Sequence, residues 1–157
     1  FHQELPSAVA LFHLHSPYTS ALSCLENPKL EMVHQNSLRF LHNVIYHNEY
    51  DGFFKDLSEG THLAKAIQDR QVMLLANHGL LVATDNIAMA FDLCYGFEQA
   101  AKFQILALST GQPLRDLYKI SPEICEKTAE EDLQPYANDF FYGMMEMLKR
   151  KSPHFQD

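Results

Sequence analysis

The sequence predicts an α/β domain in which helices cover a sheet. Three apolar segments have the length of buried strands, at residues 8–14, 72–76 and 80–83. Between and after them, apolar residues recur at steps of three and four, which is typical of amphipathic helices. A chain in which strands alternate with helices favours a sheet with helices packed against it.

Proline residues divide the first third of the chain into short elements. Pro6 is expected to stop a helix that ends within residues 1–5, because the residue before a proline disfavours helical backbone. Pro17 suits the first turn of a helix near 18–25, and the Asn27-Pro28 pair is expected to end that helix. Residues 29–54 are less regular. We expect a short helix near 34–41 and a short strand near 43–46 there.

Capping residues mark the next two helices. Ser58 is placed to cap a helix that runs to about Gln68. Thr84 or Asp85 is placed to cap a long helix over residues 86–109. The apolar positions of this long segment step by three and four, so one face of the helix should be buried.

Glycine and proline mark the end of the chain. Gly111 is expected to end the long helix, and Pro113 to prevent it from restarting. A last helix should begin after Ser121-Pro122-Glu123 and run, in one or two pieces, to about Lys151. Pro135 is the expected point of breakage, because a proline inside a helix removes a hydrogen bond and clashes with the preceding turn.

Composition narrows the class of protein. The chain has 157 residues, 46% hydrophobic and 20% charged, which suits one globular domain. The formal net charge of −8 and the lack of a basic stripe argue against nucleic-acid binding. No membrane span or signal peptide is visible, so we expect no membrane partner. Three widely spaced cysteines, Cys24, Cys94 and Cys125, suggest buried free thiols in a reducing, cytoplasmic location.

Three histidines form the most informative motif. His13 and His15 end the first apolar strand, and residues two apart on a strand point to the same side. A third imidazole, His78, follows the second apolar strand in Asn77-His78-Gly79. Three such nitrogens could hold one metal ion with positions left open, which is typical of a catalytic zinc site. The simpler alternative is that the strand-end histidines bond backbone carbonyls and that His78 only satisfies its turn.

The segments around these histidines resemble a known family. Residues 6–18, which contain His13-Leu14-His15-Ser16-Pro17, resemble the metal-binding strand and turn of the class II aldolase/adducin family. Residues 72–82, with Ala76-Asn77-His78-Gly79 at their centre, resemble its second signature, and residues 88–104 resemble the helix that follows. Residues 46–52 are similar to a segment of the adducin-like branch. The resemblance covers roughly residues 1–112.

The resemblance implies a fold and a site. It implies a three-layer αβα sandwich around a mixed or mainly antiparallel sheet, with 1–157 as a single domain. It also implies that this domain is the C-terminal two-thirds of the family's domain, with the N-terminal part preceding Phe1. A divalent metal, usually zinc, would be held by His13, His15 and His78. The glutamate that acts as acid and base in such enzymes is expected upstream of Phe1, so the catalytic residue is unknown in this chain.

The implied activity is that of a zinc-dependent lyase. The metal would stabilise an enediolate of a small keto or sugar-phosphate-type substrate, and epimerases and decarboxylases are close variants. The alternative is a non-catalytic adducin-like module for assembly or cytoskeletal binding. The family also implies a homotetramer or another homo-oligomer. Four further residues could orient the metal ligands or supply a proton: His34, His47, Tyr50 and Asn77. Structural roles are also common for residues of these types.

Overall fold

The structure is a computed structural model that describes residues 1–49, 57–131 and 134–155. The strands of its sheet are β1 (Ala10–Leu14), β2 (Val44–His47), β3 (Val72–Leu75) and β4 (Gly79–Thr84). The α-helices are α1 (Pro17–Ser23), α2 (Gln35–Leu38), α3 (Leu57–Ile67), α4 (Ile87–Leu108), α5 (Pro122–Ala129) and α6 (Gln134–Lys151). A single 3₁₀ turn, Leu114–Asp116, follows α4. None of the helices in the described ranges has the length and hydropathy needed to cross a bilayer.

The sheet is mixed, as the family resemblance implied. Its strand order is β1-β4-β3-β2. Strand β4 pairs antiparallel with both β1 and β3, whereas β2 runs parallel to β3. The carboxyl ends of β1, β2 and β3 therefore lie at one end of the sheet, together with the turn that joins β3 to β4. This end carries the histidines of the sequence motif.

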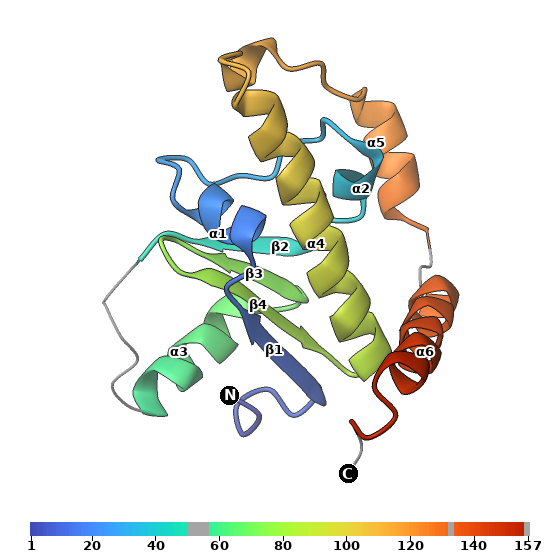
Figure 1. Cartoon of the computed structure of the whole chain (residues 1–157). Helices are drawn as coiled ribbons and strands as arrows, with labels where there is room; N and C mark the ends of the chain where they lie inside the picture. The colour runs from blue at the N-terminus through green and yellow to red at the C-terminus, as the bar shows by residue number, and fades with distance from the viewer. Residues whose placement is uncertain (50–56, 132–133, 156–157) are drawn as a thin grey trace.

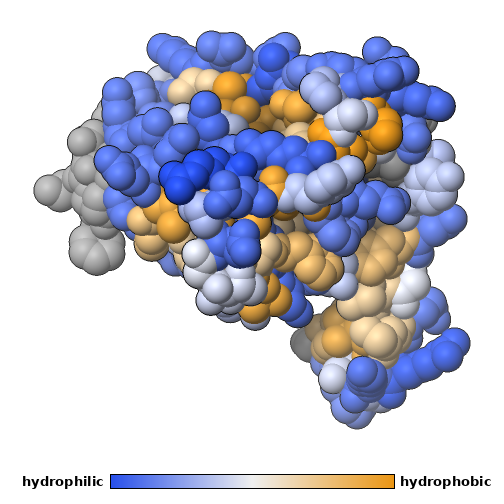
Figure 2. Space-filling view, turned by 90° about the horizontal axis from the view of Figure 1, so that it is seen from above, coloured by the Kyte–Doolittle hydropathy of each residue, from blue (hydrophilic) through white to orange (hydrophobic). Residues whose placement is uncertain are grey.

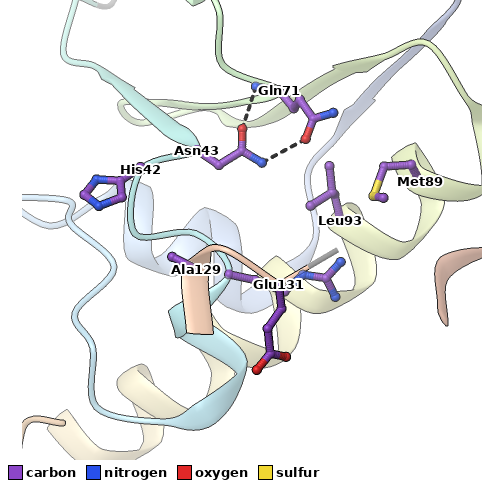
Figure 3. Close-up of a pocket in the computed structure, with 8 residues that line it drawn as sticks. His42, Asn43, Gln71, Met89, Leu93, Ala129 and Glu131 are labelled. Carbon is purple, nitrogen blue, oxygen red and sulfur yellow. Dashed lines mark hydrogen bonds between the residues drawn. The ribbon is translucent and has the colours of Figure 1, made fainter. Parts of the chain in front are cut away.

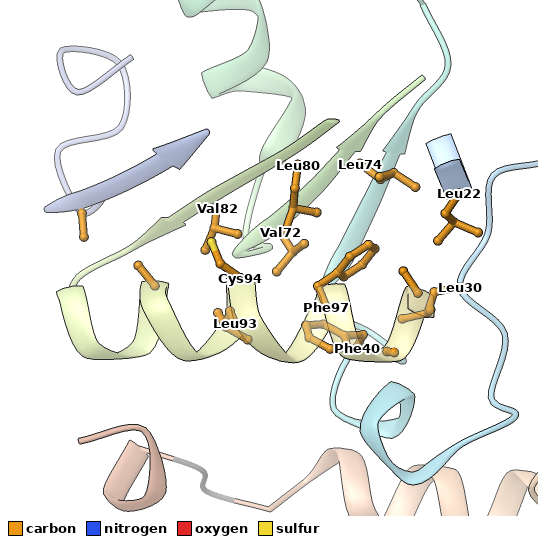
Figure 4. Packing of buried hydrophobic residues seen from close by; sticks show 14 residues of the cluster. Leu22, Leu30, Phe40, Val72, Leu74, Leu80, Val82, Leu93, Cys94 and Phe97 are labelled. Carbon is orange, nitrogen blue, oxygen red and sulfur yellow. The ribbon is translucent and has the colours of Figure 1, made fainter. Parts of the chain in front are cut away.

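Helices cover both faces of the sheet, so the predicted αβα sandwich is confirmed (Figure 1). Alternation along β3 explains the two layers: Val72 and Leu74 point to α4, and Met73 and Leu75 point to α3. Phe97 of α4 is fully buried on the first face and contacts Phe40 edge to face (Figure 4). Ile67 of α3 is fully buried on the second face.

Most predicted elements are confirmed, and the differences lie at their ends. Residues 1–5 form a turn and not the end of a helix, because the N–H groups of Glu4 and Leu5 both donate to the carbonyl of Phe1. Helix α3 begins at Leu57, so Ser58 lies inside it. Helix α4 is capped by Asn86, whose side chain accepts from the N–H groups of Ala88 and Met89.

The C-terminal helices and the cysteines follow the prediction in part. The last helical segment is in two pieces, and Pro135 lies in the first turn of α6, where a proline is tolerated. Gly111, after α4, has a φ of 86°, a left-handed conformation that suits glycine. Cys94 and Cys125 are buried, and burial raises the pKa of Cys94 to about 12. Cys24 is exposed, so the expectation of three buried thiols was wrong.

Glu98 of α4 fastens the segment that follows β1. Its carboxylate accepts hydrogen bonds from the backbone N–H groups of Tyr18 and Thr19, and from the hydroxyl of Thr19. These groups lie in the first turn of α1, where backbone donors have no partner inside the helix. Burial raises the pKa of Glu98, but hydrogen bonds from Tyr18, Thr19 and Ser16 outweigh it and lower the pKa overall.

Gly79 allows β4 to begin close to the end of β1. A Cβ at this position would meet the backbone carbonyl oxygen of Leu14 and would lie 2.8 Å from Cδ2 of His15. Both contacts are too close for a methyl group, and the carbonyl belongs to a paired strand that cannot move freely. The glycine is therefore required by this close approach of the two strands.

We expect Glu98→Ala to lower the free energy of unfolding at pH 7 by about 1–2 kcal/mol, since hydrogen bonds to a carboxylate are lost at a partly exposed site. Because the pKa of Glu98 is lower when folded, its stabilisation is complete above the ordinary glutamate pKa and is lost as the pH falls through the folded value. Urea unfolding between pH 3 and pH 7 should show a weaker acid dependence in the variant. Gln99→Ala is the control, and equal losses in both variants would contradict the assignment.

Gly79→Ala should lower the free energy of unfolding by about 1–3 kcal/mol, because the new methyl group forces β4 away from Leu14 and His15. Gly143→Ala is the matched control, since its Cβ would have no heavy atom within 4 Å and it lies inside α6. That control should be stabilised by about 0.5–1 kcal/mol. A Gly79→Ala variant as stable as wild type would show that the strands do not approach so closely.

Candidate metal centre

Strand pairing brings the three histidines of the motif together. His13 lies on β1 and pairs with Leu81 of β4, and His15 follows one residue after the end of β1. His78 lies in the turn between β3 and β4. Asn77, the residue before it, has a φ of 53°, a left-handed conformation that asparagine tolerates better than most residues. The turn thus directs His78 back toward the end of β1.

The three rings meet through the same nitrogen. Nε2 of His13 lies 3.0 Å from Nε2 of His15 and 3.1 Å from Nε2 of His78. The ring centroids are 4.7–4.8 Å apart and the rings lie at steep angles to one another. His13 and His15 are exposed and His78 is partly exposed, so the group is open to solvent on one side.

The spacing of these nitrogens fits a divalent cation. Nitrogens held at about 2.0–2.1 Å from a tetrahedral zinc lie about 3.3 Å apart. Nδ1 of His13 lies 3.1 Å from the carbonyl oxygen of Leu80, which can only accept. Nδ1 of His13 is therefore the protonated nitrogen of the neutral ring, and its Nε2 offers a lone pair to the other two rings. Lone pairs that converge at 3 Å are stabilised by a cation between them.

The electrostatics of the group favour neutral imidazoles. Partial burial lowers the pKa of His13, and the neighbouring His15 lowers it further against the opposing effect of the Leu80 carbonyl. Partial burial also lowers the pKa of His78, with added contributions from His13 and His15. A neutral imidazole is the form that binds a metal, so the site is prepared for one near neutral pH.

The structure places the other residues singled out from the sequence in different surroundings. His34 caps α2 through its Nδ1, 3.1 Å from the N–H of Asn36, and its ring stacks on Phe103 of α4 at 4.1 Å. These contacts give it a structural role away from the three imidazoles. Asn77 adjoins His78, and its backbone N–H donates to the carbonyl of Ser23. Tyr50 lies outside the described residues.

His47 belongs to a second group that the sequence did not indicate. Its Nε2 lies 3.3 Å from Nε2 of His62, a residue of α3, and Glu49 completes a group of three potential metal ligands. His62 and Glu49 carry no local signal of this role. His62 comes 15 residues after His47, and only the packing of α3 on the sheet brings the two rings together.

A hollow of about 330 Å³ lies at the opposite end of the sheet (Figure 3). It adjoins Asn43 and Gln71, the residues that precede β2 and β3. These two residues share two hydrogen bonds: Asn43 Nδ2 donates to Gln71 Oε1 at 3.0 Å, and the backbone N–H of Gln71 donates to Asn43 Oδ1 at 2.9 Å. Among the residues that the structure describes, the lining offers no convergent set of metal ligands, so the histidine group is the stronger candidate site.

A family model and several curated relatives match this sequence. The family described as Class II Aldolase and Adducin N-terminal domain matches residues 1–105. An adducin-related protein of Schizosaccharomyces pombe is 27% identical over 93% of this chain and 44% of its own length. A 5-deoxy-D-ribulose 1-phosphate aldolase of Bacillus thuringiensis is 32% identical over 73% of this chain and 50% of its own length. The chain therefore spans about half the length of these two curated relatives.

Solved structures share the fold over nearly the whole chain. An aldolase II superfamily protein from Pseudomonas syringae superposes with a TM-score of 0.87 at 27% identity, covering 99% of this chain and 62% of that one. An L-fuculose 1-phosphate aldolase from Glaciozyma antarctica superposes with a TM-score of 0.76 at 25% identity, covering 95% of this chain and 56% of that one. Sequence match and shared fold together lead to one conclusion: the chain belongs to the class II aldolase and adducin family.

Proposed function

We propose that this chain is part of a metal-dependent lyase of the class II aldolase type, acting on a small keto or sugar-phosphate-type substrate. The convergence of the Nε2 atoms of His13, His15 and His78 carries this proposal. Three neutral nitrogen ligands leave a divalent ion its full positive charge and open coordination positions. Membership of the class II aldolase and adducin family, and similarity to two sugar-phosphate aldolases, also support a lyase.

The residues of the site have distinct tasks in this proposal. His13 is oriented by the Leu80 carbonyl, while Gly79 keeps the ring of His15 and the turn close together. The exposed side of the three rings leaves room for a substrate to approach. A divalent ion such as zinc, when bound, supplies Lewis-acid polarisation of a substrate carbonyl.

Proton transfer requires a further group. We propose that a glutamate supplies the general acid and base, as in the enzymes that the chain resembles. Epimerase and decarboxylase activities need the same activation of a carbonyl, so they are variants of this proposal and differ in the bond that breaks. The substrate would be selected by groups outside the three histidines.

The second candidate function is a non-catalytic, adducin-like assembly module. The adducin-related relative matches 93% of this chain, which is more than the aldolase relative named above. Apolar side chains are also exposed on the surface (Figure 2). On α6, Tyr136 and Tyr142 are more than half exposed. Such surfaces occur at subunit contacts, and we propose a homo-oligomer, by analogy a homotetramer, for either function.

Removal of single ligands tests the metal centre. We expect wild-type protein, dialysed against zinc and then buffer, to retain the metal, and His13→Ala and His78→Ala to bind it at least about 100-fold more weakly because a direct ligand is lost. The measurement is elemental analysis with chelator competition. His154→Ala, at the far end of the chain, is the control. Full retention of zinc by both ligand variants would contradict the assignment.

Activity separates the two candidate functions. We expect the full-length parent protein to cleave small sugar phosphates or keto acids in a retro-aldol or decarboxylation assay, and to lose this activity on chelation and in His13→Ala. Activity that persists after complete chelation would contradict the metal-dependent lyase. A protein that binds zinc and assembles but turns over no member of a broad substrate panel would favour the adducin-like module.

A further inference from the structure

A second group of metal-ligating side chains lies at the same end of the sheet. His47 is the last residue of β2, Glu49 follows two residues later, and His62 lies on α3. The ligand atoms of the three side chains all lie within 4.8 Å of one another. They share no residue with the group of His13, His15 and His78.

The fold directs these side chains to one point. His47 lies two residues after Ile45, which packs into the apolar cluster beneath α3, so both side chains point to the same face of the sheet. Helix α3 covers that face and presents His62 one position before the buried Leu63. The meeting of the rings is therefore set by a strand and a helix that are packed on each other.

The distances within this group suit a cation shared by the three side chains. Nε2 of His47 lies 3.3 Å from Nε2 of His62, which equals the spacing of about 3.3 Å for two nitrogens on a tetrahedral zinc. Nε2 of His62 lies 3.9 Å from Oε2 of Glu49, too far for a hydrogen bond. Nδ1 of His47 is buried and has no hydrogen-bond partner within residues 1–49, 57–131 and 134–155, so Nε2 is the nitrogen of this ring that faces other ligands.

We propose that His47, Glu49 and His62 form a second divalent metal site, separate from the candidate catalytic centre. Two imidazoles and one carboxylate suit zinc and the neighbouring first-row metals. His13 and His47 lie on β1 and β2, with β4 and β3 between them. Three strand spacings amount to about 14 Å, so the two ions would not form a binuclear centre.

This second site has a structural consequence. A bound ion links the end of β2, through His47 and Glu49, to α3, through His62. Binding to the folded state alone stabilises it by mass action. We infer that zinc raises the melting temperature through this site even in a protein whose candidate catalytic histidines have been removed.

Metal stoichiometry tests the second site without reference to activity. Titration of the metal-free, untagged chain with Zn²⁺ should give two tight equivalents in wild type. His62→Ala should retain one equivalent, and the double variant His13→Ala/His78→Ala should retain the other. His42→Ala is the matched control: its side chain is as exposed as that of His62, at 60%, and it also pairs with a glutamate, Glu126. This control should keep both equivalents.

Glu49→Gln provides a variant with little change in shape. It should weaken the second equivalent by more than about tenfold, since even indirect partners of a metal contribute about 10–100-fold to affinity. Zinc should raise the melting temperature of His13→Ala/His78→Ala, and this rise should vanish when His62→Ala is added. A wild type that binds one equivalent, or a His62→Ala variant that still binds two, would overturn the second site. Loss of metal only in His13→Ala/His78→Ala would leave the proposed lyase intact.

Discussion

The antiparallel pairing of β1 with β4 is the interaction on which the candidate metal centre depends. It brings together His13 and His78, which are 65 residues apart in the sequence, because the backbones that carry them are adjacent. The same ladder supplies the Leu80 carbonyl that orients His13. Gly79 makes the pairing possible at its tightest point, where any side chain would meet Leu14. The geometry of the ligands is thus a property of the backbone.

The two faces of the sheet have different roles. The face toward α4 holds the larger apolar cluster. On this face, Glu98 of α4 accepts hydrogen bonds from the start of α1, the helix that follows the strand of His13. The face toward α3 holds a smaller cluster, and the side chains of His13 and His47 lie on this side. The packed face toward α4 therefore supports the histidines at the end of the face toward α3. This arrangement suits a site that must keep its geometry while staying open to solvent.

Local patterns predicted the elements well and their ends less well. The apolar runs of β3 and β4 and the long periodic stretch of α4 are strong signals, because burial against the sheet requires them. The sequence pattern favours Thr84 or Asp85 as the cap of α4, yet Asn86 makes the capping bonds. Three consecutive residues could each accept those bonds, and only the path of the chain out of β4 selects one. Phe1 and Leu5, in the first turn of the chain, likewise pack against apolar residues distant in sequence, among them Leu63 and Ile67.

By itself, the sequence determined the fold class, the family and the three histidines at strand ends, because alternation along a strand and a short turn are local properties. The tertiary structure decided which of the remaining polar residues share a site. It set His34 against Phe103, where it caps a helix, and it brought His62 to His47. The physical reason is that the buried residues of a helix, here Leu63 and Ile67, decide which side of it faces the sheet. The position of a polar neighbour such as His62 then follows from that orientation.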